Sequence, residues 1–124
     1  AQVLAPALAA GRVVLTDRYY LSSVAYQGAR GLDWHAILAD SEREFPAPDL
    51  ALLFEIDPAA GLARVRARGG AIEHGFEHPE FLTRVAEIFR AIECPYVERI
   101  DATSPVDAVS RAVRERVGER LALL

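Results

Sequence analysis

An adjacent carboxylate and guanidinium, Asp17 and Arg18, follow a short apolar segment at residues 12–16. The segment is β-branched and apolar without alternation, which predicts a short buried strand. Ligands in open parallel sheets bind beyond the carboxyl ends of the strands, so the pair is expected to border a ligand site. A carboxylate can hold a magnesium ion or its waters, and an arginine can grip a phosphate through two parallel hydrogen bonds. Taken alone, such a pair is more often an ordinary surface or capping pair.

The residues after the pair add groups that could bind a nucleotide. Residues 20–27 are predicted to form a helix that stops at Gly28 and Gly31. Its Gln27 amide, both a donor and an acceptor, is suited to reading the edge of a base. Ser23 and Tyr26 precede it on the same segment, and their structural alternative is helix packing and capping.

Two more arginines, Arg64 and Arg68, are one helical turn apart, so both can face the same side of a helix. Their simplest interpretation is a pair of solvated side chains. The alternative is that both point toward a site for a negatively charged ligand.

Composition limits the classes of function. The chain of 124 residues is 52% hydrophobic and 26% charged, which predicts one globular domain over residues 1–124. A net charge of −4 gives no support to a nucleic-acid partner, and no apolar run is long enough to predict a membrane span. The one cysteine, Cys94, is compatible with a reducing compartment and a cytoplasmic protein. All fourteen basic residues are arginine, which excludes any mechanism that needs a lysine from within these residues.

Local patterns predict apolar strands that alternate with amphipathic helices. Asp33 is a predicted helix cap, Asp57-Pro58 a helix start, and Ser104–Asp107 a capping box. Residues 69–79 are glycine-bearing and polar, and are predicted to form a mobile loop. Helices are expected near residues 3–8, 20–27, 34–43, 58–68, 79–92 and 106–121, and strands near 12–16, 50–56 and 97–101.

This alternation predicts an α/β fold with a parallel sheet and flanking helices. About three strands are expected, which is few for such a sheet and would leave open edges or an uncovered face. The chain is therefore expected to be a piece of a larger fold or to pair with another chain.

Residues 17–28 (DRYYLSSVAYQG) closely resemble the thymidylate kinase signature, an Asp-Arg pair followed by Ser-x-x-Ala-Tyr-Gln-Gly. The resemblance continues over almost the whole chain, as the rear part of that family's fold. It implies a P-loop nucleoside-monophosphate-kinase-like protein that moves the γ-phosphoryl of ATP onto dTMP, giving dTDP, with magnesium. It also implies a homodimer. The further matching segments are residues 29–33, 48–50, 53–58, 61–64 and 100–102.

The resemblance also implies a role for each matching residue. Asp17 would organise the magnesium and its waters, and Arg18 would hold the dTMP phosphate. Ser23 and Gln27 would contact the thymine, and Tyr26 would pack near the sugar. Arg64 and Arg68 would belong to the helix that leads into a lid over residues 69–79.

The sequence departs from the family's pattern in two places. A P-loop needs phosphate-cradling glycines followed by Lys and Ser/Thr, but Phe76-Glu77 stand at that place after Gly70 and Gly75. No P-loop is therefore assigned, and these 124 residues are expected to be inactive on their own. The family's lid Asp-Arg pair is also absent from residues 70–73.

Other interpretations remain open. The run His74–His78 has the His-x-x-Glu-His order of one zinc-protease group, but Gly75 and Pro79 oppose the continuous helix that such a site needs. The chain could instead be a non-catalytic nucleotide-binding or non-functional fragment. A related nucleoside or nucleotide kinase with another acceptor is a further alternative.

Overall fold

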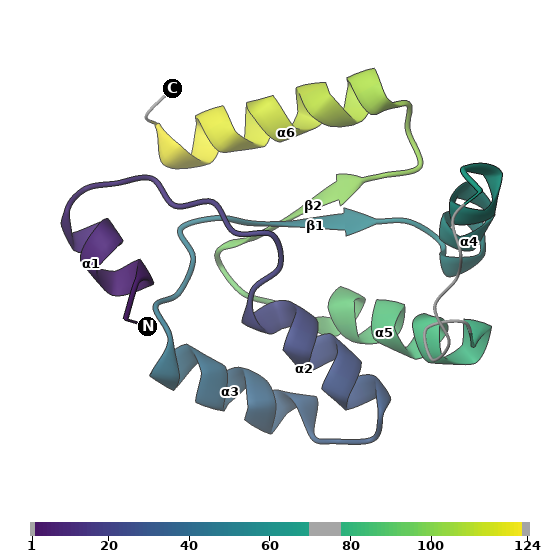
Figure 1. Cartoon of the computed structure of the whole chain (residues 1–124), viewed down its shortest axis with the longest axis horizontal. Helices are drawn as coiled ribbons and strands as arrows, with labels where there is room; N and C mark the ends of the chain where they lie inside the picture. The colour runs from purple at the N-terminus through teal and green to yellow at the C-terminus, as the bar shows by residue number, and fades with distance from the viewer. Residues whose placement is uncertain (1, 70–77, 123–124) are drawn as a thin grey trace. The chain divides into compact units, whose positions relative to one another are not determined.

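The structure is a computed structural model that describes residues 2–69 and 78–122. The chain forms two units, residues 1–47 and residues 48–124, and each has its own internal packing. Figure 1 labels the helices and strands of both units. Within the described residues, no helix combines the length and apolar character that crossing a membrane would require.

The first unit is helical, as predicted for residues 3–8, 20–27 and 34–43. It contains α1 (Leu4–Ala9), α2 (Tyr20–Ala29) and α3 (Trp34–Glu44), and α2 packs against α3. The predicted cap of α3 is confirmed, because the Asp33 carboxylate accepts hydrogen bonds from the backbone N–H groups of His35 and Ala36 at 3.1 and 3.3 Å. Gly31, at φ +100°, supplies the left-handed turn between α2 and α3.

The predicted strand at residues 12–16 is wrong. The structure assigns this segment to no strand, and Val13 and Leu15 are 80% and 96% exposed. A strand is stable only when a neighbour pairs with its backbone groups, and the first unit has no other strand among its described residues. The apolar, β-branched sequence of residues 12–16 is suited to strand pairing, but in this structure the segment has no strand partner.

The second unit is built around a parallel strand pair, so the α/β prediction is confirmed, with two strands among the described residues where about three were expected. Strand β1 (Ala51–Glu55) pairs with β2 (Val97–Asp101) in a register that sets Leu53 opposite Arg99 and Phe54 opposite Ile100. The segment between the strands carries α4 (Pro58–Ala67) and α5 (Pro79–Ala91), and α6 (Val106–Leu121) follows β2. Parallel strands require such a crossover, because a tight turn cannot join them.

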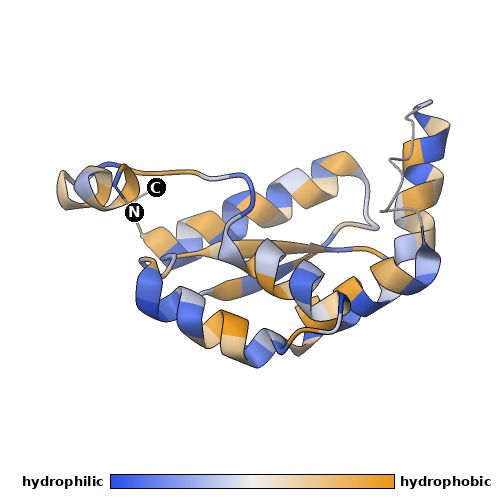
Figure 2. Cartoon of the chain, turned by 60° about the horizontal axis from the view of Figure 1, so that its bottom comes forward, coloured by the Kyte–Doolittle hydropathy of each residue, from blue (hydrophilic) through white to orange (hydrophobic). Residues whose placement is uncertain are grey.

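Helices lie on both faces of the strand pair (Figure 1). Arg99, on one face of β2, donates to the backbone oxygens of Phe89 and Ile92 at the end of α5. Glu98, on the opposite face, lies 3.9 Å from Arg116 of α6 in an ion pair. Figure 2 shows that β1 is mainly hydrophobic, whereas β2 and the helices mix hydrophobic and hydrophilic positions. This is the pattern expected when helices cover a sheet with one apolar side each.

The sequence predicted the start of α4 correctly and the start of α6 incorrectly. Asp57 caps α4 by accepting from the Ala59 N–H at 2.8 Å, and Pro58 occupies the first turn, as predicted. The capping box at Ser104 is wrong, because Pro105 occupies the cap of α6 and no side chain caps the helix. The helix starts one position later than a Ser104 cap requires, and Pro105 has no side-chain oxygen to accept an N–H of the first turn.

Candidate functional site

The Asp17-Arg18 pair lies in an exposed turn just before α2, and its backbone is strained. Arg18 has φ +58°, in the left-handed region that residues with a Cβ rarely adopt. Such a conformation costs about 1–3 kcal/mol and persists where its surroundings enforce it. Because residues of this kind gather at functional sites, the strain at Arg18 supports a functional role for this turn.

The side chain of Arg18 lies over the ring of Tyr26. Its guanidinium carbon is 5.6 Å from the ring centroid, within the range of a cation–π interaction. This contact links the turn to the next helix and fixes the direction of a long, flexible side chain. Arg18 forms no ion pair with another described residue, so its hydrogen-bond donors remain available to an anion.

Helix α2 has one buried and one exposed face, and the predicted binding residues lie together. Ser23 and Gln27 are four positions apart and exposed, and Tyr26 is half-buried beside them. The structure therefore places Arg18 beside Tyr26 on this side of α2. The opposite side carries the buried residues Tyr20, Leu21, Val24, Ala25 and Ala29.

Tyr19 anchors the turn, a role that the sequence did not assign. Its hydroxyl donates to the backbone oxygen of Pro46 at 3.1 Å, and its ring packs edge-on against Phe45 with centroids 6.4 Å apart. Burial raises the pKa of Tyr19 above its ordinary value of 10.0. The chain at the end of α3 thus holds the residue that follows Arg18. The only signal in the sequence was an aromatic residue directly after the Asp-Arg pair.

Asp17 is an exposed carboxylate that makes no hydrogen bond to another described residue. Its oxygens are therefore available to a hydrated cation, and oxygen is the ligand that magnesium prefers. The described residues hold no cluster of three or more histidine, cysteine or acidic side chains that could bind a metal directly. Asp17 thus suits contact through water and does not form a complete metal cage.

The two arginines of α4 have different surroundings. Arg64 donates to the backbone oxygens of Ala102 and Thr103 at 2.6 and 3.1 Å. Arg68 is the exposed C-cap residue of α4 and contacts no described partner through a hydrogen bond or ion pair. Arg64 and Arg68 therefore do not act as a matched pair, although the sequence spacing suggested that they could.

The remaining candidate segments are covered only in part. Residues 70–77, which include most of the predicted lid and of the zinc-protease-like run, lie outside the described residues. His78 is described and has extended backbone before α5, at φ −76° and ψ 114°. This confirms that Pro79 keeps His78 out of helical geometry.

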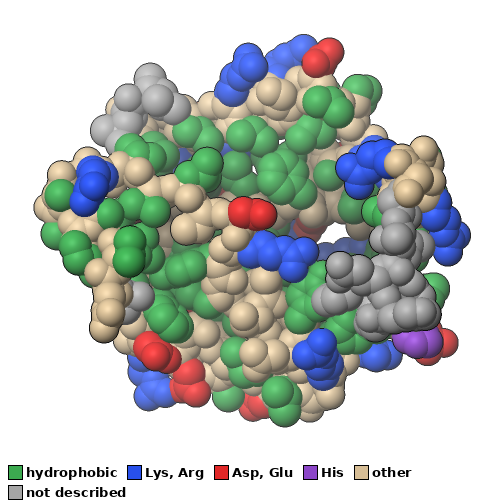
Figure 3. Space-filling model, viewed as in Figure 1, with side chains coloured by type: hydrophobic (Ala, Val, Ile, Leu, Met, Phe, Trp, Pro, Cys, Tyr) green, Lys and Arg blue, Asp and Glu red, His purple; other side chains and the backbone are tan. Residues whose placement is uncertain are grey.

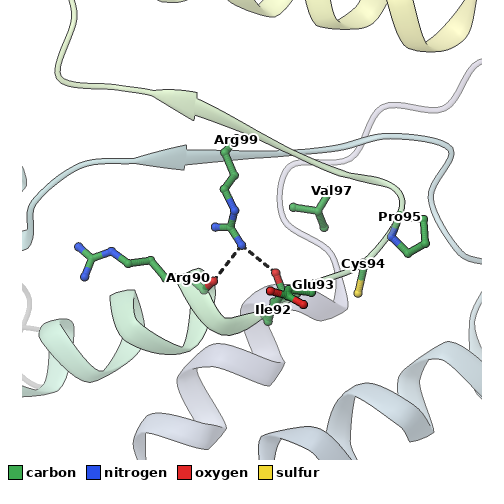
Figure 4. Close-up of a pocket in the computed structure, with 7 residues that line it drawn as sticks. All are labelled: Arg90, Ile92, Glu93, Cys94, Pro95, Val97 and Arg99. Atoms are coloured by element: carbon green, nitrogen blue, oxygen red, sulfur yellow. Dashed lines mark hydrogen bonds between the residues drawn. The ribbon is translucent and has the colours of Figure 1, made fainter.

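A cavity of about 440 Å³ opens in the second unit, and none of the predicted site residues lines it. Figure 4 shows that the Arg99 side chain points to the backbone oxygens of Arg90 and Ile92 beside it. The donors of Arg99 are thus used in hydrogen bonds within the protein, and this side chain is poorly suited to binding a ligand. The face drawn in Figure 3 shows arginines dispersed among carboxylates and hydrophobic groups, without a broad basic patch among the described residues. The cavity is lined by Arg90, Ile92, Glu93, Cys94, Pro95, Val97 and Arg99.

Parallel strands joined through helices define the second unit as part of an α/β protein, and the turn before α2 gives the chain a candidate anion site. The thymidylate kinase family model matches residues 1–113, and the chain belongs to this family.

Relatives named thymidylate kinase match nearly the whole chain. One from Xanthomonas campestris pv. campestris (strain B100) is 47% identical over 120 residues, which are 97% of this chain and 52% of the relative. One from Desulfotalea psychrophila is 40% identical over 120 residues, which are 97% of this chain and 59% of the relative. The chain therefore spans about half the length of the curated relatives it matches.

Proposed function

We propose that these residues form the acceptor-nucleotide side of an enzyme that transfers the γ-phosphoryl of ATP to dTMP, giving dTDP. The family membership supports this reaction, since the relatives are named thymidylate kinase. The observation that carries the proposal is the position of Arg18, whose guanidinium lies over Tyr26 on the helix that also exposes Ser23 and Gln27.

In this proposal each side chain performs the chemistry for which it is suited. Arg18 holds the phosphate of dTMP through paired N–H groups, and its cation–π contact with Tyr26 limits its motion before binding. Tyr26 packs near the sugar, while Ser23 and Gln27 donate to and accept from the thymine edge. Phosphoryl transfer depends mainly on positioning and charge neutralisation, which such groups can supply.

Magnesium and ATP complete the proposed reaction. Asp17 would accept hydrogen bonds from the waters of a magnesium ion, and the ion would neutralise phosphate charge. Arg68 would add a positive charge from the end of α4. The chain contains no lysine, so the lysine of a phosphate-cradling loop would have to come from sequence beyond these 124 residues.

Nucleotide binding tests the proposal directly. Isothermal titration of the chain with dTMP, dUMP and dCMP should give the tightest binding for dTMP. Gln27→Leu should weaken dTMP binding about tenfold, the effect of leaving base-edge groups without partners. Arg66→Ala is the matched control, because Arg66 is exposed and contacts no described partner through a hydrogen bond or ion pair. Equal affinity for all three nucleotides would contradict the proposed acceptor.

A second candidate is a non-catalytic nucleotide-binding or non-functional fragment, and the observation that favours it is that these 124 residues contain no lysine for a phosphate-cradling loop. Sequencing the DNA upstream of Ala1 for an in-frame Gly-x-x-x-x-Gly-Lys-Ser/Thr distinguishes the two proposals. A coupled ADP-release assay should detect no turnover by the pure 124-residue chain. Measurable dTDP formation would show that residues 1–124 are sufficient for catalysis.

A further inference from the structure

Arg64 connects two parts of the second unit that are far apart in sequence. From α4, its two terminal nitrogens donate to the backbone oxygens of Ala102 and Thr103, 38 and 39 residues away. These oxygens belong to the turn directly after β2. A guanidinium presents its N–H groups in a rigid fork, so one side chain can hold two successive carbonyls at once.

The same turn is also held by the sheet and by its own side chains. The Ala102 N–H donates to the backbone oxygen of Glu55 at 2.9 Å, which extends the β1–β2 ladder by one residue. The Asp101 carboxylate accepts from the Thr103 N–H at 2.9 Å and from its hydroxyl at 2.5 Å. The N–H groups of Ala102 and Thr103 are therefore bonded to the strand pair and to Asp101. Their carbonyl oxygens are bonded to Arg64 of α4.

Arg64 differs in this respect from its neighbours on the helix. Arg66 and Arg68 are exposed and have no hydrogen bond or ion pair with another described residue. The Arg64 contacts are thus a specific feature and not a general property of arginines on α4. A guanidinium that already holds two carbonyls is poorly placed to grip a phosphate as well.

We infer that Arg64 is a positioning residue that ties α4 to the Ala102–Thr103 turn at the carboxyl end of β2, and not a phosphate-binding residue. Ligands of parallel α/β proteins bind at that end of the strands, so a fixed turn keeps this end of the β1–β2 pair in one shape for a nucleotide. The inference rests on the proposed function for the presence of a nucleotide there. The contacts themselves are independent of it.

Hydrogen exchange of the 124-residue chain, measured by NMR, tests this role with three variants. Arg64→Met keeps an apolar stem and removes both the fork and the charge, whereas Arg64→Lys keeps the charge and can reach only one carbonyl. Arg64→Met should accelerate exchange of the Ala102 and Thr103 amides about tenfold, because the turn opens more often when its carbonyls lose both donors. Arg64→Lys should accelerate exchange of the same amides by a smaller factor, because one carbonyl keeps its donor. Arg66→Met is the control and should leave both rates unchanged.

The effect of the Arg64 charge is measured separately, through the pKa of Asp101. The Thr103 hydroxyl holds the pKa of Asp101 below its ordinary value, and the Arg64 guanidinium adds to the effect. Arg64→Met should therefore raise the measured pKa of Asp101, and Arg64→Lys should not. If Arg64 only stabilised α4, both variants would change amide exchange throughout α4. The pKa of Asp101 would then not distinguish Arg64→Met, which loses the charge, from Arg64→Lys, which keeps it.

Unchanged amide exchange in Arg64→Met would overturn the inference, as would faster exchange across the whole second unit. Loss of phosphate affinity without a change at the turn would show that Arg64 binds phosphate instead. Failure of the parent chain to bind dTMP would count against the proposed function alone, because the exchange rates and the Asp101 pKa are measured without ligand.

Discussion

Arg99 of β2 donates to the Glu55 carboxylate of β1 at 2.5 Å, and the two residues lie diagonally on the same face of the parallel pair. The same guanidinium also donates to three backbone oxygens at the end of α5, those of Phe89, Arg90 and Ile92. The last carbonyls of a helix have no partner within the helix, so Arg99 satisfies groups that α5 leaves open. One side chain therefore joins both strands to the helix that covers them.

Replacing Arg99 should destabilise the second unit. Arg99→Met leaves the α5 carbonyls without their donor and should lower the free energy of unfolding by about 1–2 kcal/mol. Glu55→Gln keeps the contacts to α5 and should cost less, about 0.5 kcal/mol, because both charged side chains are partly exposed. Urea unfolding measures both changes, with the exposed Arg111→Met on α6 as control. An Arg99→Met cost no larger than that of the control would contradict the proposed helix-end role.

Arg18 allows the backbone strain to be separated from phosphate binding. Arg18→Gly removes the guanidinium and relieves the left-handed conformation, whereas Arg18→Ala removes the guanidinium and keeps the strain. The glycine variant should therefore be more stable than the alanine variant by about 1 kcal/mol in urea unfolding. Both should bind dTMP at least about tenfold more weakly by calorimetry. Retained dTMP affinity in both variants would remove Arg18 from the phosphate site.

The hydroxyl of Tyr19 should make stability sensitive to alkaline pH. Burial raises its pKa above 10.0 in the folded chain, so folding favours the protonated form. This contribution is fully present below the unfolded pKa and is lost as pH rises through the folded pKa. Tyr19→Phe should cost about 1 kcal/mol at neutral pH through the lost bond to Pro46. Above pH 10 the difference between the two proteins should shrink, and a difference that grows there would show the sign to be wrong.

Asp101 should titrate below its ordinary pKa of 3.8. The Thr103 hydroxyl and N–H lower the value most, so folding favours the ionised form. The stability that Asp101 contributes is present above pH 3.8 and is lost as pH falls through the lower folded value. Thr103→Val removes the hydroxyl bond and should move the carboxyl titration, followed by NMR, back toward 3.8. An identical titration in both proteins would mean that the hydroxyl bond does not form in solution.

Local chemistry determined which elements could be predicted from the sequence. Asp33 and Asp57 each accept a backbone N–H two residues onward, and Pro58 suits the first turn of a helix, so neighbouring residues alone define these starts. The segment at residues 12–16 could not be predicted in the same way. Its apolar sequence describes a strand, but strand formation depends on a partner that no local pattern reveals.

The candidate site also contains features set by neighbouring residues, which could be predicted, and features set by distant partners, which could not. Arg18, Tyr26 and Gln27 lie close together in sequence, so their spacing on a turn and a helix was predictable. Arg64 reaches Ala102 at a separation of 38 residues and Arg99 reaches Glu55 at a separation of 44, and only the fold brings these pairs together. The spacing of Arg64 and Arg68 suggested equal roles, because it carries no information about which guanidinium reaches a distant carbonyl.

The register of the strand pair sets Phe54 opposite Ile100, yet Phe54 is 55% exposed and Ile100 only 2%. Helix α6 contacts β2, which explains why these two neighbours on one face differ so strongly. Tolerance to substitution should differ accordingly. Random mutagenesis with selection for folded protein should recover polar residues freely at position 54 and almost none at position 100, where replacing a buried isoleucine by alanine costs about 2–5 kcal/mol. Sequence drift in this pair is thus expected to accumulate at position 54 and to be purged from position 100.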